Sequence, residues 1–179
     1  MFKGNYRYHN LTISNRIFRV QKITPNLWFD HQAEEAAKFY VSVFKNAKIL
    51  STTHYDEASA AVSGMPVGSV LTVSFQLDGQ EFVTLNGGPI YTFSPAISLS
   101  IACATQAEVD RFWETLSKGG APGQCGWLTD KYGVSWQVVP TVLPKMLADK
   151  DPARVSRVLK ALLPMTKIEV AVLEKAFKG

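Results

Sequence analysis

Residues 25–48 read PNLWFDHQAEEAAKFYVSVFKNAK, and their pattern predicts a β-strand followed by an α-helix. The strand covers residues 22–29. In the helix, over residues 33–44, apolar residues recur at helical spacing and therefore share one face. Asp30 or His31 precedes this helix as its candidate N-cap.

The same pattern returns 73 residues further along the chain. Residues 96–103 predict a strand, and residues 106–117 predict a helix that Thr105 caps and a Gly-Gly pair ends. The shift pairs equivalent helix positions: Glu35 with Glu108, Phe39 with Phe112, Tyr40 with Trp113, and Val43 with Leu116. The alternative is coincidence, because amphipathic helices share apolar spacing in any case. We interpret the pattern as an internal repeat of two modules that pack together, because each alone would leave a sheet face open to water.

Other segments complete the two modules. Residues 69–77 and 80–85 alternate across Asp78-Gly79, a dipeptide that favours a tight hairpin turn because both positions tolerate positive φ. Residues 56–68 are small and turn-prone, so we expect a mobile loop that could cover a cavity. The remaining predictions are strands over 48–55, 123–128 and 134–139, and helices over 142–148, 152–163 and 167–177.

The net charge of +4 does not indicate nucleic-acid binding once it is located along the chain. Residues 1–22 hold five basic residues and no acidic one, and residues 140–179 hold eight basic and four acidic residues. The segment between them holds six basic and eleven acidic residues. A phosphate-binding surface needs basic residues clustered on one structured face. We therefore expect no nucleic-acid partner.

Cysteine content and hydropathy bear on the compartment. Two cysteines, Cys103 and Cys125, are too few for a disulfide-stapled secreted domain and favour a reducing compartment. No apolar run approaches the roughly 20 residues of a membrane span. Residues 1–21 lack the continuous apolar region of a signal peptide, and we interpret them as a leader or extension. We expect a cytoplasmic protein without a membrane partner.

The run CGWLTDKYGVSWQVVP, residues 125–140, carries a resemblance to a known family. Together with ITPNLWFD, residues 23–30, and the helix that follows, it resembles the PhnB-like branch of the vicinal oxygen chelate superfamily. That superfamily includes glyoxalase, bleomycin-resistance proteins and extradiol dioxygenases, and the branch is often labelled 3-demethylubiquinone-9 3-methyltransferase-like. The resemblance covers residues 22–178.

The resemblance implies an α+β fold of two βαβββ modules with added C-terminal helices. Each module would be a curved sheet whose concave side holds the ligand, and the assembly would commonly be a homodimer. We place the vicinal oxygen chelate domain at residues 22–140, with modules at about 22–88 and 95–140. Residues 141–179 would form a helical extension of the same domain.

Metal-dependent members of the superfamily place one ligand on each of four strands. The resemblance puts these positions near Pro25 or Asn26, near Thr84, near Ala96 and on Gln137. None of them is a histidine or a carboxylate, the groups that hold Zn²⁺, Fe²⁺ or Mn²⁺. We therefore expect neither the usual metal site nor a cofactor. A site in the loop made by His54, Asp56 and Glu57 is the open alternative.

Strand alternation, combined with the implied concave sheets, suggests a set of ligand-contacting side chains. The predicted ligand-binding residues are Asn26, Trp28, Thr84, Asn86, Trp127 and Gln137. Aromatic walls with a few neutral amides suit a planar or amphipathic small molecule. For the tryptophans the alternative is packing in the core, and for the amides it is a structural hydrogen bond.

Two catalytic chemistries have little support. Cys125 precedes Gly-Trp near the presumed cavity and is a weak candidate nucleophile, whereas Cys103 lies in an apolar strand and is typical of a small buried hydrophobe. The chain has no Gly-x-Gly-x-x-Gly turn between a strand and a helix, so its residues do not support AdoMet-dependent methyl transfer.

The preferred interpretation is a small-molecule-binding protein that acts by sequestration or sensing, with a ligand that the residues do not identify. The alternative is an enzyme of the same superfamily, such as a lyase, isomerase, dioxygenase or transferase. Four orthodox metal ligands would favour the enzyme, and the four aligned positions hold none.

Overall fold

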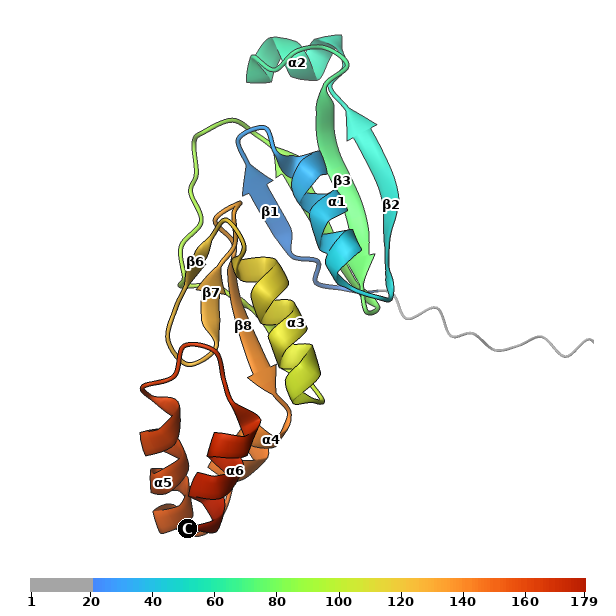
Figure 1. Ribbon diagram of the computed structural model, residues 1–179. Coiled ribbons are helices and arrows are strands. Elements are labelled where there is room, and N and C mark those ends of the chain that lie inside the picture. Colours follow the sequence, from blue (N-terminus) through green and yellow to red (C-terminus); the bar gives the residue numbers. More distant parts are fainter. Residues whose placement is uncertain (1–20) are drawn as a thin grey trace, which may run out of the picture.

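The computed structural model describes residues 21–179 and contains two βαβββ modules followed by three helices (Figure 1). The predicted leader, apart from Gln21, lies outside the described residues. The first module contains β1 (Asn26–Phe29), α1 (Ala33–Val43), β2 (Ala47–His54), α2 (Glu57–Ser63), β3 (Val70–Leu77) and β4 (Gln80–Asn86). The second contains β5 (Leu99–Cys103), α3 (Gln106–Ser117), β6 (Ala121–Pro122), β7 (Trp127–Thr129) and β8 (Ser135–Pro140).

The internal repeat is confirmed. The two sheets have equivalent strand orders, β1-β4-β3-β2 and β5-β8-β7-β6, and in each the first strand runs parallel to the last. β1 and β5 begin 73 residues apart, at Asn26 and Leu99, and α1 and α3 begin 73 residues apart, at Ala33 and Gln106. The predicted α+β fold of two modules is therefore correct.

The hairpin between β3 and β4 follows the turn chemistry that the sequence predicts. Asp78 has φ 46° and Gly79 has φ 89°, so both turn residues are left-handed. Leu77 pairs with Gln80 across this two-residue turn, and the register continues to Thr72 opposite Leu85. The turn thereby fixes which residues of β4 face the helix.

Three local predictions were wrong. Neither Asp30 nor His31 is the N-cap of α1, which is Gln32 and forms no side-chain cap hydrogen bond. The segment 56–68, predicted as a loop, contains α2, because the Asp56 carboxylate accepts a hydrogen bond from the Ser59 backbone N–H and the Ser59 hydroxyl oxygen accepts one from the Asp56 backbone N–H. The strand predicted over 123–128 is interrupted by a turn at Gln124–Gly126, so that β6 and β7 are short.

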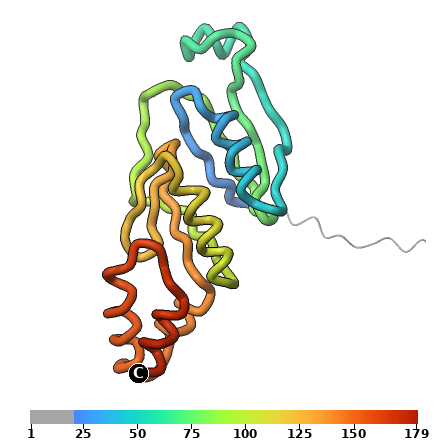
Figure 2. Tube along the Cα trace, viewed as in Figure 1, coloured from blue at the N-terminus to red at the C-terminus, as the bar shows by residue number. Residues whose placement is uncertain are grey.

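Three helices follow the modules, as predicted: α4 (Val142–Leu147), α5 (Pro152–Leu162) and α6 (Val170–Lys178). The three helices lie together at the C-terminal end of the molecule (Figure 2). A second buried cluster forms there, with Val158 of α5, Leu173 of α6 and Ile168 of the connection between these helices. Lys167 joins this part to α3 through an ion pair with Asp110 at 2.5 Å. No helix within residues 21–179 is long and apolar enough to span a membrane.

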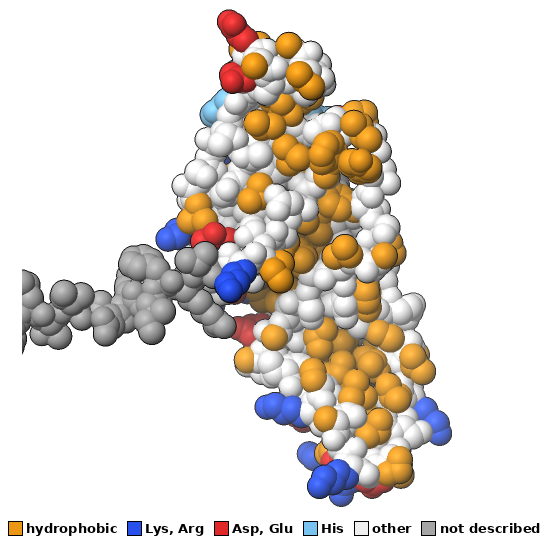
Figure 3. All heavy atoms as spheres, turned by 180° about the vertical axis from the view of Figure 1, so that it is seen from behind, with side chains coloured by type: hydrophobic (Ala, Val, Ile, Leu, Met, Phe, Trp, Pro, Cys, Tyr) orange, Lys and Arg blue, Asp and Glu red, His pale blue; other side chains and the backbone are white. Residues whose placement is uncertain are grey.

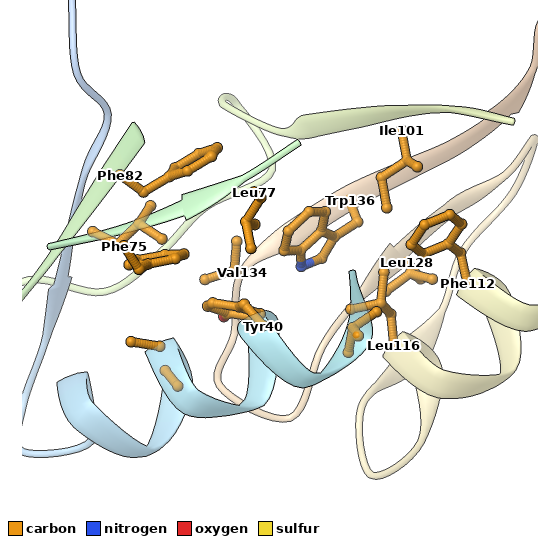
Figure 4. Close-up of a cluster of buried hydrophobic side chains, with 14 of the residues drawn as sticks. Tyr40, Phe75, Leu77, Phe82, Ile101, Phe112, Leu116, Leu128, Val134 and Trp136 are labelled. Carbon is orange, nitrogen blue, oxygen red and sulfur yellow. The ribbon is translucent and has the colours of Figure 1, made fainter. Parts of the chain in front are cut away.

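The two modules share one hydrophobic core, in which Trp136 of β8 is central (Figure 4). Its ring centroid lies 5.4 Å from Tyr40 and 6.1 Å from Phe44, both in the first module. Phe44 also lies 5.0 Å from Phe112 of α3. These aromatic contacts join the first module to the second. Side chains from both modules therefore come together at the boundary between them.

Gly126, in the turn before β7, has no room for a side chain. Its φ is 83°, and a Cβ would lie 2.7 Å from the Val138 carbonyl oxygen and 2.9 Å from Ile168. We expect Gly126→Ala to lower the free energy of unfolding by about 2–4 kcal/mol, the sum of a left-handed backbone and a forced displacement. Gly64→Ala is the control, because Gly64 has φ 73° with nothing within 4 Å of the added Cβ. Equal losses in urea denaturation of the two variants would contradict the steric argument.

Candidate functional site

Each sheet has a face covered by a helix and an open face. On β1 the buried Leu27 alternates with Asn26 and Trp28, which are exposed and half-buried. Leu27 pairs with Thr84 of β4, and Trp28 pairs with Leu85. Because paired residues share a face, Asn26 and Trp28 lie on the open face and Thr84 lies on the covered face.

Thr84 and Asn86 fasten α1 to the first sheet. The Thr84 hydroxyl donates to the Ala33 carbonyl at 2.9 Å, and the Asn86 amide oxygen accepts from the Ala33 backbone N–H at 2.8 Å. The Asn86 side-chain N–H also donates to the Val70 carbonyl. These buried polar atoms are satisfied within the module, and they point away from the face that carries Asn26 and Trp28.

On the open face, Trp28 packs against the segment that links the two modules, residues 87–98, called the link below. Its indole N–H donates to the Gly88 carbonyl at 2.9 Å, and its ring lies edge-on to Tyr91 at 5.1 Å. Tyr91, Ile90 and Ile97 of this link are 65%, 71% and 82% exposed. Viewed from the side opposite to Figure 1, hydrophobic side chains form a band along the molecule (Figure 3).

Trp127 and Gln137 lie side by side on the open face of the second sheet, where they are directly paired across β7 and β8. The Gln137 side-chain N–H donates to the Ser98 hydroxyl at 2.8 Å. The structure thus brings Trp127 and Gln137 together, and separates them from Thr84 and Asn86.

A cleft of about 640 Å³ lies between the modules. It lies between the tip of the β3–β4 hairpin on one side and β5 and α3 on the other. Its apolar walls are Pro25, Phe44, Leu77, Phe82, Leu99, Ile101, Phe112 and Trp136, several of which Figure 4 shows. A second cavity of about 280 Å³ lies between β1, the link and the start of β8.

One predicted residue lines a cavity, and a second contacts a residue that lines both cavities. Asn26 lines the smaller one, and Gln137 bonds to Ser98, which lines both. Trp28, Thr84, Asn86 and Trp127 do not line the large cleft.

The charged groups of the large cleft were missed by sequence reasoning. Arg111 and Glu108 come from α3, Lys45 follows α1, and Asp78 lies in the hairpin turn. On the sequence, Arg111 is an ordinary polar position of an amphipathic helix. Only the packing of α3 against the first module brings it to a cavity.

A buried carboxylate, Asp130, connects the modules beside this cleft. One oxygen accepts hydrogen bonds from the Tyr40 hydroxyl at 2.9 Å and the Trp136 indole N–H at 2.8 Å, and the other accepts from the backbone N–H groups of Tyr132 and Val134. Burial raises the pKa of Asp130, although these hydrogen bonds oppose the shift. All its partners lie within the protein, so Asp130 is a structural link.

At Cys103, burial and the Glu108 charge outweigh the nearby Arg111 charge, which would lower the pKa of the thiol. Burial raises the pKa of the Cys103 thiol to about 11, so this group is protonated at neutral pH. Cys125 has φ 56° and lies near the carbonyl end of α5, with its sulfur 3.7 Å from the Leu162 carbonyl oxygen. Neither geometry shows a base that would activate a nucleophile.

The donor set at the four aligned positions does not fit a metal ion. Asn26 donates to the Thr24 carbonyl, Thr84 donates to Ala33, and Gln137 donates to Ser98, so these side chains are neutral and engaged. The alternative loop site is also engaged, because Asp56 caps α2. Within residues 21–179, no three His, Cys, Asp or Glu side chains come together as a metal-binding group.

Two βαβββ modules of equal strand order, packed on one core, define a protein of the glyoxalase-like class. The model of the 3-demethylubiquinone-9 3-methyltransferase family matches residues 21–139, and the chain belongs to this family. The PhnB protein from Bacillus cereus is 38% identical, with a TM-score of 0.61 over 68% of this chain and 100% of that one. Protein PA1353 from Pseudomonas aeruginosa shares the fold at 19% identity, with a TM-score of 0.54 over 67% of this chain and 97% of its own. None of the curated proteins compared with this chain matches it.

Proposed function

We propose that the protein binds a small organic molecule with a largely apolar body in the cleft between its modules. The observation that carries this proposal is the cleft of about 640 Å³. Pockets for small ligands commonly enclose about 300–1,000 Å³ and combine apolar walls with a few polar groups. Here Phe44, Phe112 and Trp136 provide aromatic walls, and Ser98 and Ser100 provide hydroxyl groups.

The predicted residues enter this proposal in different ways. Asn26 would contact a ligand that extends into the smaller cavity, and Gln137 would orient the Ser98 hydroxyl that both cavities share. Trp28 and Trp127 remain predictions for the open faces. Thr84 and Asn86 would act indirectly, by holding α1 against its sheet.

A homodimer and a cytoplasmic location complete the proposal. The exposed Ile90, Tyr91 and Ile97 place apolar side chains on the link between the modules, where association with a second copy would cover them. Light scattering of the purified full chain measures the molar mass and hence the oligomeric state. A monomer at micromolar concentration would contradict the proposed dimer.

Filling the cleft is expected to abolish ligand binding. Ala102 is exposed on the cleft wall, so Ala102→Trp adds an indole without displacing a buried side chain. We expect 2-naphthol, 2-naphthamide or menadione to raise the melting temperature of the unaltered protein, and Ala102→Trp to weaken binding by about tenfold or more in calorimetry.

Ala171→Trp is the matched control, because Ala171 is exposed on α6 and lies outside both cavities. It should bind the same probes as tightly as the unaltered protein does. Equal binding by Ala102→Trp and the unaltered protein would place the ligand elsewhere. Failure of all three neutral probes and of 2-naphthoate to bind at millimolar concentration would overturn the proposal.

An enzyme of the same family is the second candidate, and the family name is the observation that favours it. That name implies methyl transfer from AdoMet to a phenolic substrate. Two of the described glycines have packing roles, because a Cβ on Gly87 would overlap the Trp28 ring and a Cβ on Gly126 would overlap the Val138 carbonyl. Titration of AdoMet in the same calorimetric assay tests this candidate, and saturable binding would favour it over passive binding.

A further inference from the structure

The cleft contains a half-buried arginine, Arg111, that forms no ion pair within residues 21–179. Arg111 donates one hydrogen bond, from Nη1 to the Val43 carbonyl at 2.6 Å, and its guanidinium lies 3.9 Å from the Phe112 ring centroid. The Val43 bond caps the C-terminal end of α1. It uses one of five N–H donors, so the guanidinium is held in place with donors to spare.

The acidic groups of the cleft do not pair with Arg111. Glu108 accepts a hydrogen bond from the Ala104 backbone N–H at 2.7 Å, and Asp78 is exposed in the hairpin turn. Among residues 21–179, no carboxylate lies within 4.0 Å of the Arg111 or Lys45 side-chain nitrogens. A partly buried cation without an anionic partner is costly, and a bound anion would remove that cost.

We propose that the ligand of the cleft carries a carboxylate, which the Arg111 guanidinium binds while the aromatic or aliphatic body of the ligand packs against Phe112 and Trp136. This inference rests on the proposed function and names its ligand class. The guanidinium is planar and matches a carboxylate through two parallel N–H groups. Lys45, exposed at the same cleft, adds a second positive charge at longer range.

The test compares acids with neutral molecules of the same shape. Benzoate, 2-naphthoate and 9-anthroate are titrated calorimetrically into the full chain, each beside its primary amide. We expect at least one acid to bind about tenfold more tightly than its amide. In Arg111→Gln the acid should lose about tenfold to a hundredfold in affinity while the amide changes by less than about threefold.

Lys118→Gln is the matched control, because Lys118 is an exposed cation at the end of α3 outside the cleft lining. It should leave the ratio of acid to amide affinity unchanged. Arg111→Lys keeps the charge without the planar fork and should recover part of the acid affinity. Acids and amides that bind equally well, in the unaltered protein and in Arg111→Gln alike, would overturn the carboxylate inference and leave the proposed function standing. Binding by neither set would overturn both.

Discussion

Asp130→Ala is expected to lower the free energy of unfolding by about 3–5 kcal/mol. The substitution leaves the Trp136 indole N–H, the Tyr40 hydroxyl and two backbone N–H groups without their acceptor, in a site where Asp130 is 2% exposed. Each buried donor without a partner costs about 1–3 kcal/mol, although neighbouring groups relax in part. Urea denaturation followed by circular dichroism measures the loss, and a loss below about 1 kcal/mol would show that water replaces the carboxylate.

Asp130→Asn separates the charge from the hydrogen bonds. Because burial raises the pKa of Asp130 in the folded protein, the folded state binds this proton more tightly than the unfolded chain, whose Asp pKa is about 3.9. Asp130 therefore contributes fully to the free energy of unfolding below about pH 3.9. This contribution is lost as the pH rises through the pKa that Asp130 has in the folded protein. The stability advantage of the unaltered protein over Asp130→Asn should shrink as the pH rises above about 4. An advantage that grows over this range would contradict the raised pKa.

The sequence predicts the fold well because the fold depends on local patterns. The helix at 106–117 has its Thr105 cap and its glycine stop, and the hairpin has its Asp-Gly turn, and all of these appear as expected. The segment 56–68 failed because small residues are compatible with both loop and helix. The Asp56–Ser59 capping box decides for the helix only once both hydrogen bonds are formed.

The candidate site could be predicted only in part, because it is built from contacts distant in the sequence. Strand alternation correctly places Asn26 with Trp28 on one face of β1, but it does not reveal the pairing of Trp127 with Gln137, and it does not tell which face of β4 the helix covers. Thr84 and Asn86 consequently face α1. Asp130 precedes the turn before β8, and only the packing of the two modules brings the Tyr40 hydroxyl and the Trp136 indole N–H to its carboxylate.

Trp136→Ala is expected to lower the free energy of unfolding of residues 22–140 by about 3–5 kcal/mol. Removal of the large buried ring leaves a cavity that the surrounding side chains fill only in part. Trp136 is 2% exposed and contacts Tyr40 and Phe44 of the other module. Trp113→Ala is the matched control: Trp113 is half-buried on α3, so its removal should cost less than half as much. Trp136→Phe keeps a ring but loses the bond to Asp130, and should fall between the two variants.

The number of transitions in the unfolding curve tests whether the two modules unfold as one unit. We propose that the two modules form one domain, since Trp136, Phe44 and Phe112 belong to a single hydrophobic core and neither module could bury these rings alone. Circular dichroism and tryptophan fluorescence should then report one coincident transition, in the unaltered protein and in Trp136→Ala. Two separated transitions in Trp136→Ala would show that the modules fold independently. In that case the cleft would lie between two domains free to move against each other, and ligand binding should then depend on their closure.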